Sequence, residues 1–485
     1  MAREHPFWIA GRAARSARVL DVTTPFDGSI VGRTWLAGSD EFEQAVDAAV
    51  TAAPAMRGLP AYERASILAT ASAQIRSRRD EIARTIALEA GKPIKDAAVE
   101  ADRAVGTFQA AADEARRLAG EVVPMDLAPH GAGRLGITRR FPLGPIAAIS
   151  PFNFPFNLAA HKVAPAIAAG NTVVLKPATK TPLSALLLGD IVQSSGLPPG
   201  ALNVVPMDRE TGDRLVTDER FKLLTFTGSS AVGWTMKARA GKKRVILELG
   251  GNAGVIVDRR ADLDFAAKRV TSGGFAFAGQ SCIAVQRVFV HETVLREFTD
   301  RLVGLVEQLK LGDPLDPSTD VGPMIEEDEA ARVDSWVKEA VASGARVLIG
   351  GRRCGAAMYM PTVLTDVPLD AKVCAEEVFA PLVGVLPFSD FDRALDLVNA
   401  SAYGLQAGVF THDLEHALAA FDRLEVGGVI VNDVPTWRID HMPYGGVKDS
   451  GLGREGPRYT IEEMTELKLL VINRQQTTPN MRNPA

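Results

Sequence analysis

Short apolar segments alternate with helical segments between residues 144 and 249, and no other feature constrains the fold as strongly. Alternating strands and helices predict a parallel sheet that is covered by helices on both faces. The predicted strands are residues 146–150, 172–176, 201–205, 222–226 and 244–249, and the predicted helices are residues 156–169, 183–195 and 230–239. In such a sheet, ligands bind beyond the carboxyl ends of the strands.

A second alternating region follows Gly251 and predicts a second α/β domain. Its predicted strands are residues 287–291, 347–349, 382–388, 408–411 and 428–432, and its predicted helices are residues 263–277, 293–309, 328–343, 391–400 and 414–424. Nearer the N-terminus, residues 40–119 have helical spacing, and breaks at residues 58–60 and 91–93 divide them into several helices. Residues 122–141 predict an extended arm or hairpin, and residues 466–472 predict an edge strand.

Composition argues against several classes of function. The formal net charge of −5 provides no basic surface for nucleic acid. No apolar run has the length of a membrane span, and the N-terminal segment lacks the continuous apolar core of a secretory signal. The three widely spaced cysteines fit a reducing compartment and form no zinc ligand pattern, so we expect a cytoplasmic protein without a bound metal.

Cys282 lies in the segment FAFAGQSCIAVQR, between a predicted helix and a predicted strand. A Gly-Gln-Ser turn at such a junction exposes a thiol. A thiolate is a strong nucleophile, but an unperturbed cysteine with a pKa of about 8.5 needs a nearby base or dipole at neutral pH. Taken alone, the segment equally allows a buried, inert cysteine.

Two polar residues follow predicted strands of the first sheet. Asn153, in ISPFNFPFN, lies in a loop stiffened by prolines, where its amide is available to donate to an oxyanion. Glu248, in LELGGNAG, has few polar neighbours in sequence, so we expect a raised pKa and the ability to act as a base. The alternatives are an asparagine that satisfies its own turn and a structural carboxylate bonded to backbone.

Two further strand ends suggest phosphate or ribose contacts. TFTGSSAVG, residues 225–233, is a strand followed by a glycine turn that opens a helix, and this leaves N–H groups free to meet a phosphate. VVLKPATKTP places Lys176 at the end of another strand. Each signal is weak by itself, because a capped helix start and a solvated lysine are common.

Together with PYGGVKDSGLGREG near the C-terminus, these segments resemble the aldehyde dehydrogenase superfamily over essentially the whole chain. The resemblance implies an α/β fold with a Rossmann-like cofactor domain, an α/β catalytic domain and a small β oligomerisation arm. It assigns residues 1–121 and 143–250 to NAD(P) binding and residues 251–450 to catalysis. Residues 122–142 and 465–485 are then the oligomerisation arm and C-terminal strand of a homodimer or homotetramer.

The resemblance also implies the catalytic roles. Cys282 attacks the aldehyde to form a thiohemiacetal, and Asn153 with the Cys282 backbone N–H stabilises the oxyanion. After hydride transfer to the nicotinamide, Glu248 activates the water that hydrolyses the thioester. Lys162 and Glu455 match positions with a proton-relay or structural role.

NAD or NADP is the cofactor that the resemblance implies. Lys176 matches an adenine-ribose contact, Ser229 a pyrophosphate contact, and Glu377 and Phe379 contacts to the nicotinamide ribose and ring. The full expected set is Ser150, Pro151, Phe152, Lys176, Thr179, Gly228, Ser229, Leu249, Gly250, Glu377 and Phe379. Many NAD-selective members have a glutamate where this chain has Thr179. An acid there repels a 2′-phosphate and threonine does not, so we expect NADP to be accepted.

The substrate pocket is expected to involve one helical face, because Phe154, Leu158 and His161 have the spacing i, i+4 and i+7. By resemblance, its lining is Phe154, Asn157, Leu158, His161, Ser281, Ile283, Trp437, Arg438 and Tyr444. Three of these positions, Asn157, His161 and Arg438, are polar where members that oxidise simple aliphatic aldehydes tend to be apolar. We therefore expect a small hydroxylated or anionic aldehyde.

Arg438 is the main support for an anionic substrate, because a buried arginine without an anion is costly. The alternative is that Arg438 pairs with Asp440 or Asp433. Within the superfamily, NLAAHKVAPAIAAGN, YGLQAGVFT and LEVGGVIVN are similar to the lactaldehyde and non-phosphorylating glyceraldehyde-3-phosphate dehydrogenases. Ser281 stands where phosphate-binding members can have an arginine, so lactaldehyde, glycolaldehyde or a semialdehyde is as plausible as the phosphorylated aldehyde.

Other functions remain as alternatives. One is a broad-specificity aliphatic or aromatic aldehyde dehydrogenase. A CoA-acylating relative is disfavoured by Glu248, and a catalytically silent relative is disfavoured because Cys282, Asn153 and Glu248 are all present. A cysteine hydrolase would need a histidine beside the thiol, and no sequence setting suggests such a pair.

Overall fold

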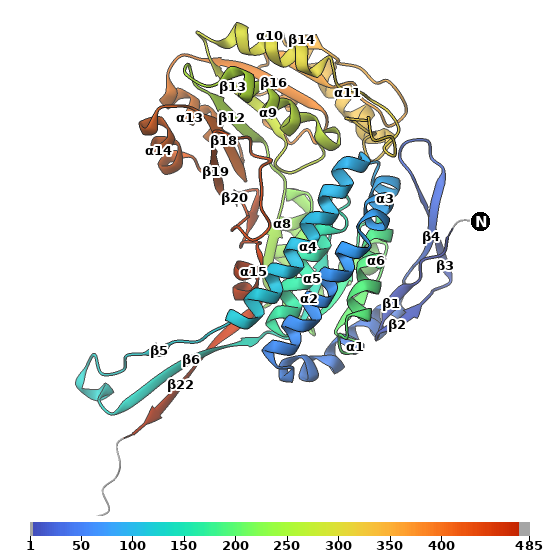
Figure 1. Cartoon of the computed structure of the whole chain (residues 1–485), viewed down its shortest axis with the longest axis vertical. Coiled ribbons are helices and arrows are strands. Elements are labelled where there is room, and N and C mark those ends of the chain that lie inside the picture. Colours follow the sequence, from blue (N-terminus) through green and yellow to red (C-terminus); the bar gives the residue numbers. More distant parts are fainter. Residues whose placement is uncertain (1–2, 475–485) are drawn as a thin grey trace, which may run out of the picture.

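The computed structural model describes residues 3–474, which form two large sheets and a projecting arm (Figure 1). The first sheet has the strand order β2-β1-β9-β8-β7-β10-β11-β21. Its strands are β1 (Phe7–Ile9), β2 (Arg12–Ala14), β7 (Pro145–Ile149), β8 (Thr172–Lys176), β9 (Leu202–Val204), β10 (Leu223–Thr227), β11 (Arg244–Glu248) and β21 (Gly451–Leu452). Neighbouring strands from β9 to β11 are parallel, which confirms the predicted sheet.

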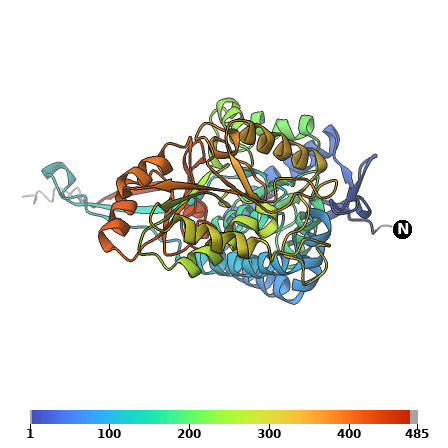
Figure 2. The ribbon, with the colours of Figure 1, turned by 90° about the horizontal axis from the view of Figure 1, so that it is seen from above.

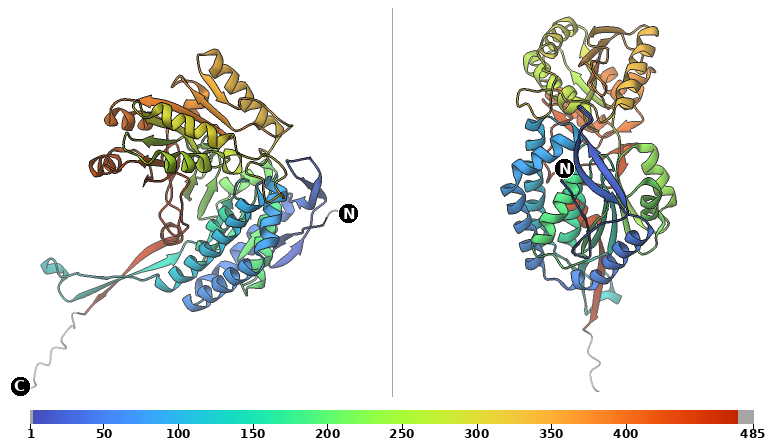
Figure 3. Two further views of the ribbon diagram at one scale, coloured as in Figure 1. Left: turned by 45° about the horizontal axis from the view of Figure 1, so that its top comes forward. Right: turned by 90° about the vertical axis from the view of Figure 1, so that its right-hand side faces the viewer.

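Helices cover both faces of the first sheet (Figure 3). On one face α5 and α6 lie on the strands, and α2, α3 and α4 pack over them, whereas α1, α7 and α8 lie on the other face. The helices are α1 (Ser39–Gly58), α2 (Ala61–Ser77), α3 (Arg79–Ala90), α4 (Ile94–Arg117), α5 (Asn157–Ala169), α6 (Pro182–Ser194), α7 (Arg209–Thr217), α8 (Ser230–Arg239) and α15 (Pro457–Glu463). Every residue of α5 is buried, because this helix lies between the sheet and α2, α4 and α15.

The second sheet has the strand order β14-β15-β16-β13-β12-β18-β19. Its strands are β12 (Ala253–Val257), β13 (Val285–His291), β14 (Arg346–Ile349), β15 (Thr362–Thr365), β16 (Leu382–Phe388), β18 (Gln406–Phe410) and β19 (Gly428–Val431). Its helices are α9 (Leu263–Phe275), η2 (Ala276–Gly279), α10 (Leu295–Val306), α11 (Glu327–Ala342), α12 (Lys372–Ala375), α13 (Phe391–Asn399) and α14 (Leu414–Arg423). Each sheet has its own hydrophobic core.

The sequence analysis does not predict α7, β12 or β15. Helix α7 is polar, with only Gly212, Leu215 and Val216 buried among its residues, so it has little apolar periodicity. Strand β12 follows β11 after the Gly250-Gly251 turn, and the two strands belong to different sheets. Local patterns do not reveal this change of sheet.

The arm is a separate sheet with the strand order β22-β6-β5. It consists of β5 (Val122–Val123), η1 (Pro129–Gly131), β6 (Arg134–Pro142) and β22 (Thr465–Asn473), and it extends away from both cores (Figure 1). Five apolar side chains of β22 are between 42% and 57% exposed: Leu467, Leu469, Leu470, Val471 and Ile472. Part of the expected C-terminal segment, residues 475–485, lies outside the described residues.

Two small pairs of strands complete the fold. β3 (Arg18–Thr23) pairs with β4 (Ile30–Leu36), and β17 (Tyr403–Gly404) pairs with β20 (Val447–Lys448). The β3–β4 pair and the arm lie at opposite ends of the molecule (Figure 2). Among residues 3–474, no helix has the length and apolarity needed to cross a membrane.

Candidate active site

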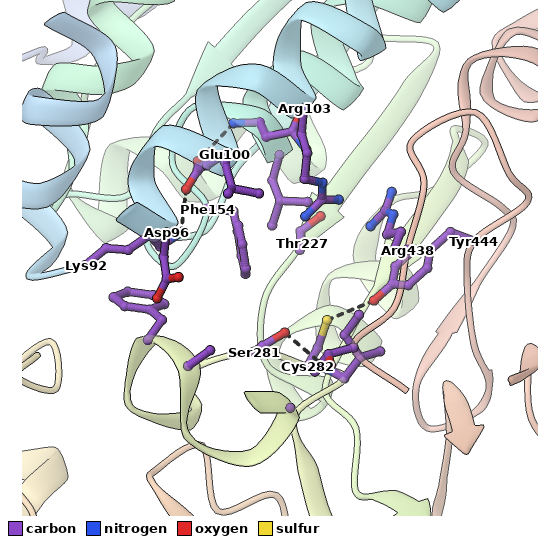
Figure 4. Close-up of a pocket in the computed structure, with 18 of the residues that line it drawn as sticks. Lys92, Asp96, Glu100, Arg103, Phe154, Thr227, Ser281, Cys282, Arg438 and Tyr444 are labelled. Carbon is purple, nitrogen blue, oxygen red and sulfur yellow. Dashed lines mark hydrogen bonds and ion pairs between the residues drawn. The ribbon is translucent and has the colours of Figure 1, made fainter. Parts of the chain in front are cut away.

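Two cavities meet at Cys282. The thiol cavity has a volume of about 280 Å³ and lies between α4, the loop before α5 and the segment after β19 (Figure 4). The strand-end cavity has a volume of about 550 Å³ and lies at the carboxyl ends of strands of the first sheet. Leu158, Thr227, Glu248 and Cys282 line both cavities, so a ligand in one is directly beside a ligand in the other.

A left-handed turn brings Cys282 to this position. Phe277, Ala278 and Gly279 have φ values of 49°, 52° and 67°, so the chain reverses between α9 and β13. Gly279 is required at this turn, because a Cβ there would lie 2.1 Å from the carbonyl oxygen of Ala380. Two strained non-glycine residues beside the thiol are typical of a functional turn.

Cys282 is half-buried in the walls of the two cavities. Its Sγ is 3.0 Å from the phenolic oxygen of Tyr444. Burial raises the pKa of Cys282 to about 12; the hydrogen bond with Tyr444 opposes this shift, and the nearby carboxylates of Glu377 and Glu248 reinforce it. The thiol is therefore protonated at neutral pH, and its reaction requires a base.

Glu248, at the end of β11, is a second titratable group on the walls of both cavities. It is buried, and neither carboxylate oxygen has a hydrogen-bond partner among the described residues. Burial, and then the neighbouring charge of Glu455, raise the pKa of Glu248 well above its usual value. A carboxylate held in this way is able to accept and release a proton near neutral pH.

A polar cluster lies behind Glu248. The Lys162 ammonium on α5 donates to the hydroxyls of Thr227 at 2.7 Å and Thr225 at 3.1 Å, and it is 3.4 Å from the Glu455 carboxylate. Burial lowers the pKa of Lys162. Burial alone would raise the pKa of Glu455, but the charge of Lys162 and other nearby cations outweighs it and lowers that pKa. The cluster thus holds the ionised carboxylate of Glu455 close to Glu248, whose carboxyl group is able to take up a proton.

Asn153 is fixed against the nucleophile turn. Its Nδ2 donates to the carbonyl oxygen of Gln280 at 3.0 Å, and the side chain is buried. The amide has a second N–H, which remains to be donated to an oxygen formed next to Cys282. Asn153 is thus held by the loop that carries the thiol.

The strand-end cavity fits a dinucleotide. Ser229, which lines the cavity, is the N-cap of α8 and makes no side-chain capping bond, so this helix begins beside the cavity without a side-chain cap. Gly250 leaves room for Glu377, because a Cβ at Gly250 would lie 2.5 Å from a Glu377 carboxylate oxygen. Nine of the expected contacts line this cavity: Ser150, Pro151, Phe152, Gly228, Ser229, Leu249, Gly250, Glu377 and Phe379.

Glu377 faces the same cavity from the second sheet. Its carboxylate accepts the backbone N–H of Gly251 at 2.8 Å, and burial raises its pKa to about 7. The rings of Phe152 and Phe379 meet edge to face, with centroids 5.9 Å apart. A carboxylate and an aromatic ring are suited to a ribose and a flat heterocycle respectively.

Lys176 and Thr179 do not line the strand-end cavity. The Lys176 ammonium donates to the carbonyl oxygen of Pro177 at 3.4 Å, and the Thr179 hydroxyl donates to the carbonyl oxygen of Met207 at 3.4 Å. Helix α11 and its approach contribute residues that sequence reasoning misses: Ile325, Glu326, Glu329, Arg332 and Trp336. No local motif marks them, because they come from a helix of the other sheet.

Most expected substrate residues line the thiol cavity: Phe154, Asn157, Leu158, Ser281, Ile283, Arg438 and Tyr444. His161 does not; it is fully buried, with Nε2 2.9 Å from an Asp440 carboxylate oxygen. Trp437 is 45% exposed and also lies off the cavity wall. The expected helical face fails at His161, because its ring lies against Thr107, Asp440 and Arg438 and not against the cavity.

Sequence reasoning misses an entire wall of the thiol cavity. This wall comes from the α3–α4 turn and α4, and it includes Lys92, Asp96, Val99, Glu100 and Arg103 (Figure 4). Further lining residues come from α9 and from the segment after β19: Arg269, Ser272, Gly273 and Thr436. In the sequence, the charged residues of α4 have the pattern of a solvent-exposed helix face. They line the thiol cavity because α4 packs onto α5.

Arg438 pairs with neither Asp440 nor Asp433. Asp433 accepts from Arg269 at 2.6 Å, and Asp440 accepts from Arg103 at 2.8 Å. The Arg438 guanidinium instead lies 3.6 Å from the centroid of the Tyr444 ring, and one of its nitrogens is 3.3 Å from His161 Nε2 and 3.4 Å from Glu455. Its Nε has no hydrogen-bond partner in the described part of the chain. Arg438 is thus a buried cation that is incompletely paired at the cavity wall.

Comparisons with known proteins assign the class of this chain. The model of the "Aldehyde dehydrogenase family" matches residues 11–470. The 3-sulfolactaldehyde dehydrogenase of Priestia aryabhattai is 44% identical over 97% of this chain and 98% of its own length. The lactaldehyde dehydrogenase of Methanocaldococcus jannaschii is 39% identical over 94% of this chain and 97% of its own length.

Solved structures agree with this assignment. Aldehyde dehydrogenase 21 of Physcomitrella patens, solved with the reaction product succinate, has a TM-score of 0.96 and 47% identity, covering 98% of this chain and 100% of its own. The glyceraldehyde-3-phosphate dehydrogenase GapN of Methanocaldococcus jannaschii, solved with NADP, has a TM-score of 0.90 and 39% identity, covering 94% and 99%. The chain belongs to the aldehyde dehydrogenase family. It is an oxidoreductase that oxidises an aldehyde with NAD or NADP.

Proposed function

We propose that this enzyme oxidises a small aldehyde bearing an anionic or hydroxyl group to the carboxylic acid, and that it does so through a thioester on Cys282. Arg438 is the single observation that carries the proposal. It is a buried guanidinium on the wall of the thiol cavity, with an unpartnered Nε and a weak contact with Glu455. A substrate anion would supply the missing partner, since an incompletely paired buried charge is costly.

The same geometry supports a sequence of catalytic steps. A water molecule carries the thiol proton to solvent, and the Cys282 sulfur attacks the aldehyde carbon to form a thiohemiacetal. Asn153 and the Cys282 backbone N–H donate to the resulting oxyanion. A nicotinamide cofactor, when bound in the strand-end cavity, would supply the hydride acceptor for conversion of this adduct to a thioester. Glu248 takes a proton from water, the hydroxide attacks the thioester carbon, the carbon–sulfur bond breaks, and the proton passes from Glu248 to the Cys282 sulfur as the acid leaves.

The strand-end cavity is proposed to hold the cofactor. The uncapped start of α8 at Ser229 suits the pyrophosphate, and Glu377 suits the nicotinamide ribose. We further propose that NADP is accepted, since Thr179 is not an acid and both of its neighbours, Ala178 and Lys180, line this cavity. The expected result is NADPH formation at a kcat/KM at least comparable to that for NADH, and Thr179→Glu should lower the NADP value by about tenfold.

Substrate choice is tested by comparing anionic and neutral aldehydes of similar size. Succinic semialdehyde and 3-sulfolactaldehyde should give a higher kcat/KM than butanal and lactaldehyde. Arg438→Met should lower the value for the anionic aldehydes by about 10- to 100-fold and change the neutral ones much less. If Arg438→Met lowers all four equally, Arg438 serves the catalytic cluster and not the substrate anion.

A broad-specificity enzyme is the second candidate. Phe154, Leu158, Phe277 and Ile283 give the thiol cavity a partly apolar wall. Hexanal or benzaldehyde would then lead the panel. A CoA-acylating or catalytically silent relative remains disfavoured, because the buried base Glu248 is present beside the thiol.

Assembly and location are also proposals. The exposed apolar side chains of β22 support a homodimer, or a dimer of dimers, formed through the arm. We assign residues 1–121 and 143–250 to the cofactor domain and 251–450 to the catalytic domain, and we place the protein in the cytoplasm. Light scattering of the wild type and of Leu469→Glu/Val471→Glu tests the arm, since charges there should give monomers.

A further inference from the structure

A buried ion pair in the wall of the thiol cavity has no role in the catalytic steps above. Lys92, in the turn between α3 and α4, is 1% exposed, and its ammonium contacts the carboxylate of Glu100, which is also 1% exposed. Both residues line the thiol cavity (Figure 4). Removing two charges from water is costly, so other contacts of this pair must offset the cost of burying it.

Glu100 holds the loop that carries Asn153. One of its carboxylate oxygens accepts the backbone N–H groups of Phe156 at 3.0 Å and Asn157 at 3.1 Å. These are the N–H groups at the start of α5, where negative charge is favourable. Asn153 lies only three residues before the first of them, so Glu100 fixes the end of the Asn153 loop to α4.

Lys92 contacts both loops that carry catalytic groups. Its ammonium is 3.6 Å from the centroid of the Phe154 ring and 4.5 Å from that of Phe277, and the two rings meet edge to face. Phe154 follows Asn153 directly, and Phe277 begins the left-handed turn that leads to Cys282. Two rings from different loops therefore close on one fixed cation.

The two residues act on different loops. Glu100 holds the end of the Asn153 loop, and the Lys92 ammonium lies against one ring from the Asn153 loop and one from the Cys282 loop. The direct link between the loops, from Asn153 Nδ2 to the Gln280 carbonyl oxygen, is a single hydrogen bond of 3.0 Å.

We propose that Lys92 and Glu100 are positioning residues that set the distance between the Asn153 amide and the Cys282 sulfur. The inference rests on the proposed function, in which that amide stabilises the oxyanion. An oxyanion donor acts only at hydrogen-bond distance, and a displacement of about 1 Å costs up to about 100-fold in rate. Loosening the pair should therefore slow acylation while substrate and cofactor still bind.

The test is a double-mutant cycle with Asn153. Lys92→Met keeps the volume of the side chain and removes the charge, and Lys92→Met/Glu100→Gln removes both charges together. Each is made in the wild type and in Asn153→Ala, and the rate of the first turnover of NADPH formation is measured beside KM. In the wild-type background we expect the first-turnover rate to fall about tenfold, with KM values within about threefold. In the Asn153→Ala background we expect less than about a twofold further loss, because the donor being positioned is already absent.

Glu89 provides a matched control. It is another buried carboxylate, 1% exposed, and it caps a different helix by accepting the N–H groups of Leu183 and Ser184 at the start of α6. Glu89→Gln should lower thermal stability, as we expect of Lys92→Met/Glu100→Gln, yet leave the first-turnover rate within about twofold of the wild type.

Two results overturn the inference. One is a wild-type first-turnover rate in the Lys92→Met enzyme, and the other is a full tenfold loss that persists in the Asn153→Ala background. Should Lys92→Met fail to fold, the charge-matched double variant supplies the same comparison. Wild-type protein that oxidises aldehydes in these experiments keeps the proposed function even if the positioning role fails, whereas inactive wild-type protein overturns both.

Discussion

The two cavities that meet at Cys282 are built in different ways. The strand-end cavity is lined largely by strand ends and glycine turns, including Gly228 and Gly250. The thiol cavity is lined by side chains from α4, the nucleophile turn and the segment after β19, and several are buried charges. Backbone shape therefore dominates the cofactor side, and charge and hydrogen bonding dominate the reacting side. We therefore expect that single substitutions can change cofactor binding without changing the reaction at Cys282, and the reverse.

The largest effect is expected from Cys282→Ser. Replacing the sulfur should lower aldehyde oxidation by about four orders of magnitude or more, because the covalent step is lost. Cofactor affinity should be unchanged, since the backbone of the strand-end cavity is intact. Steady-state assays and calorimetric titration with NADP measure the two effects. A variant that loses cofactor binding together with activity would contradict the separation of the cavities.

Glu248→Gln should separate the two halves of the reaction. We expect one rapid turnover of NADPH formation, followed by a steady-state rate that is lower by about 10²- to 10³-fold, because deacylation lacks its base. In the wild type the steady-state rate should rise with pH through the raised pKa of Glu248, since only the ionised form accepts a proton. The variant should lose this rise. Stopped-flow traces from pH 5 to 9 report both, and an unchanged pH profile would exclude Glu248 as the base.

Gly250→Ala tests the backbone-built cavity. The added methyl group would lie 2.5 Å from a Glu377 carboxylate oxygen, so Glu377 must move. We expect the cofactor KM to rise about tenfold, with little change in the labelling of Cys282 by iodoacetamide. Gly304→Ala in α10 is the control, because no atom lies within 4 Å of its added carbon. Equal effects of the two substitutions would contradict a specific role for Gly250.

A smaller effect concerns stability. Burial raises the pKa of Glu377 from its usual value of 4.5 to about 7. Between these values the folded protein binds more protons than the unfolded chain, so the free energy of unfolding falls as pH rises, by at most about 1.4 kcal/mol per pH unit. Glu377→Gln should remove this contribution. Urea unfolding at pH 5 and pH 7.5 measures it, and an identical pH dependence in both proteins would show that Glu377 is not buried in this way.

The helices and strands that the sequence predicts are those whose pattern is set by neighbouring residues. Helix periodicity and strand alternation gave β8, α8 and β16 with their observed bounds, because each is set by residues adjacent in sequence. Helix α7 and strand β12 were not predicted. Helix α7 has little apolar periodicity, and β12 belongs to a different sheet from β11, which precedes it across a glycine turn.

The residues of the site also fall into those marked by a local motif and those placed by tertiary packing. Glycine turns and the Cys282 segment are local signals, and the structure brings Cys282, Glu248 and Asn153 to one place. Lys92, Glu100 and Arg103 were missed, because the packing of α4 onto α5 makes them part of the cavity and no motif records that packing. His161 does not lie on the wall, because its ring is turned to Asp440 and Arg438, which come from a segment distant in sequence.

A small anionic aldehyde should leave its acyl group on Cys282 as a covalent intermediate. This is measured by the mass of Glu248→Gln after a single turnover with succinic semialdehyde and NADP, followed by peptide mapping. We expect one added acyl group, located on the peptide that contains Cys282 and absent without NADP. An acyl group on Cys354 or Cys374, or none at all while NADPH is still formed, would exclude this intermediate.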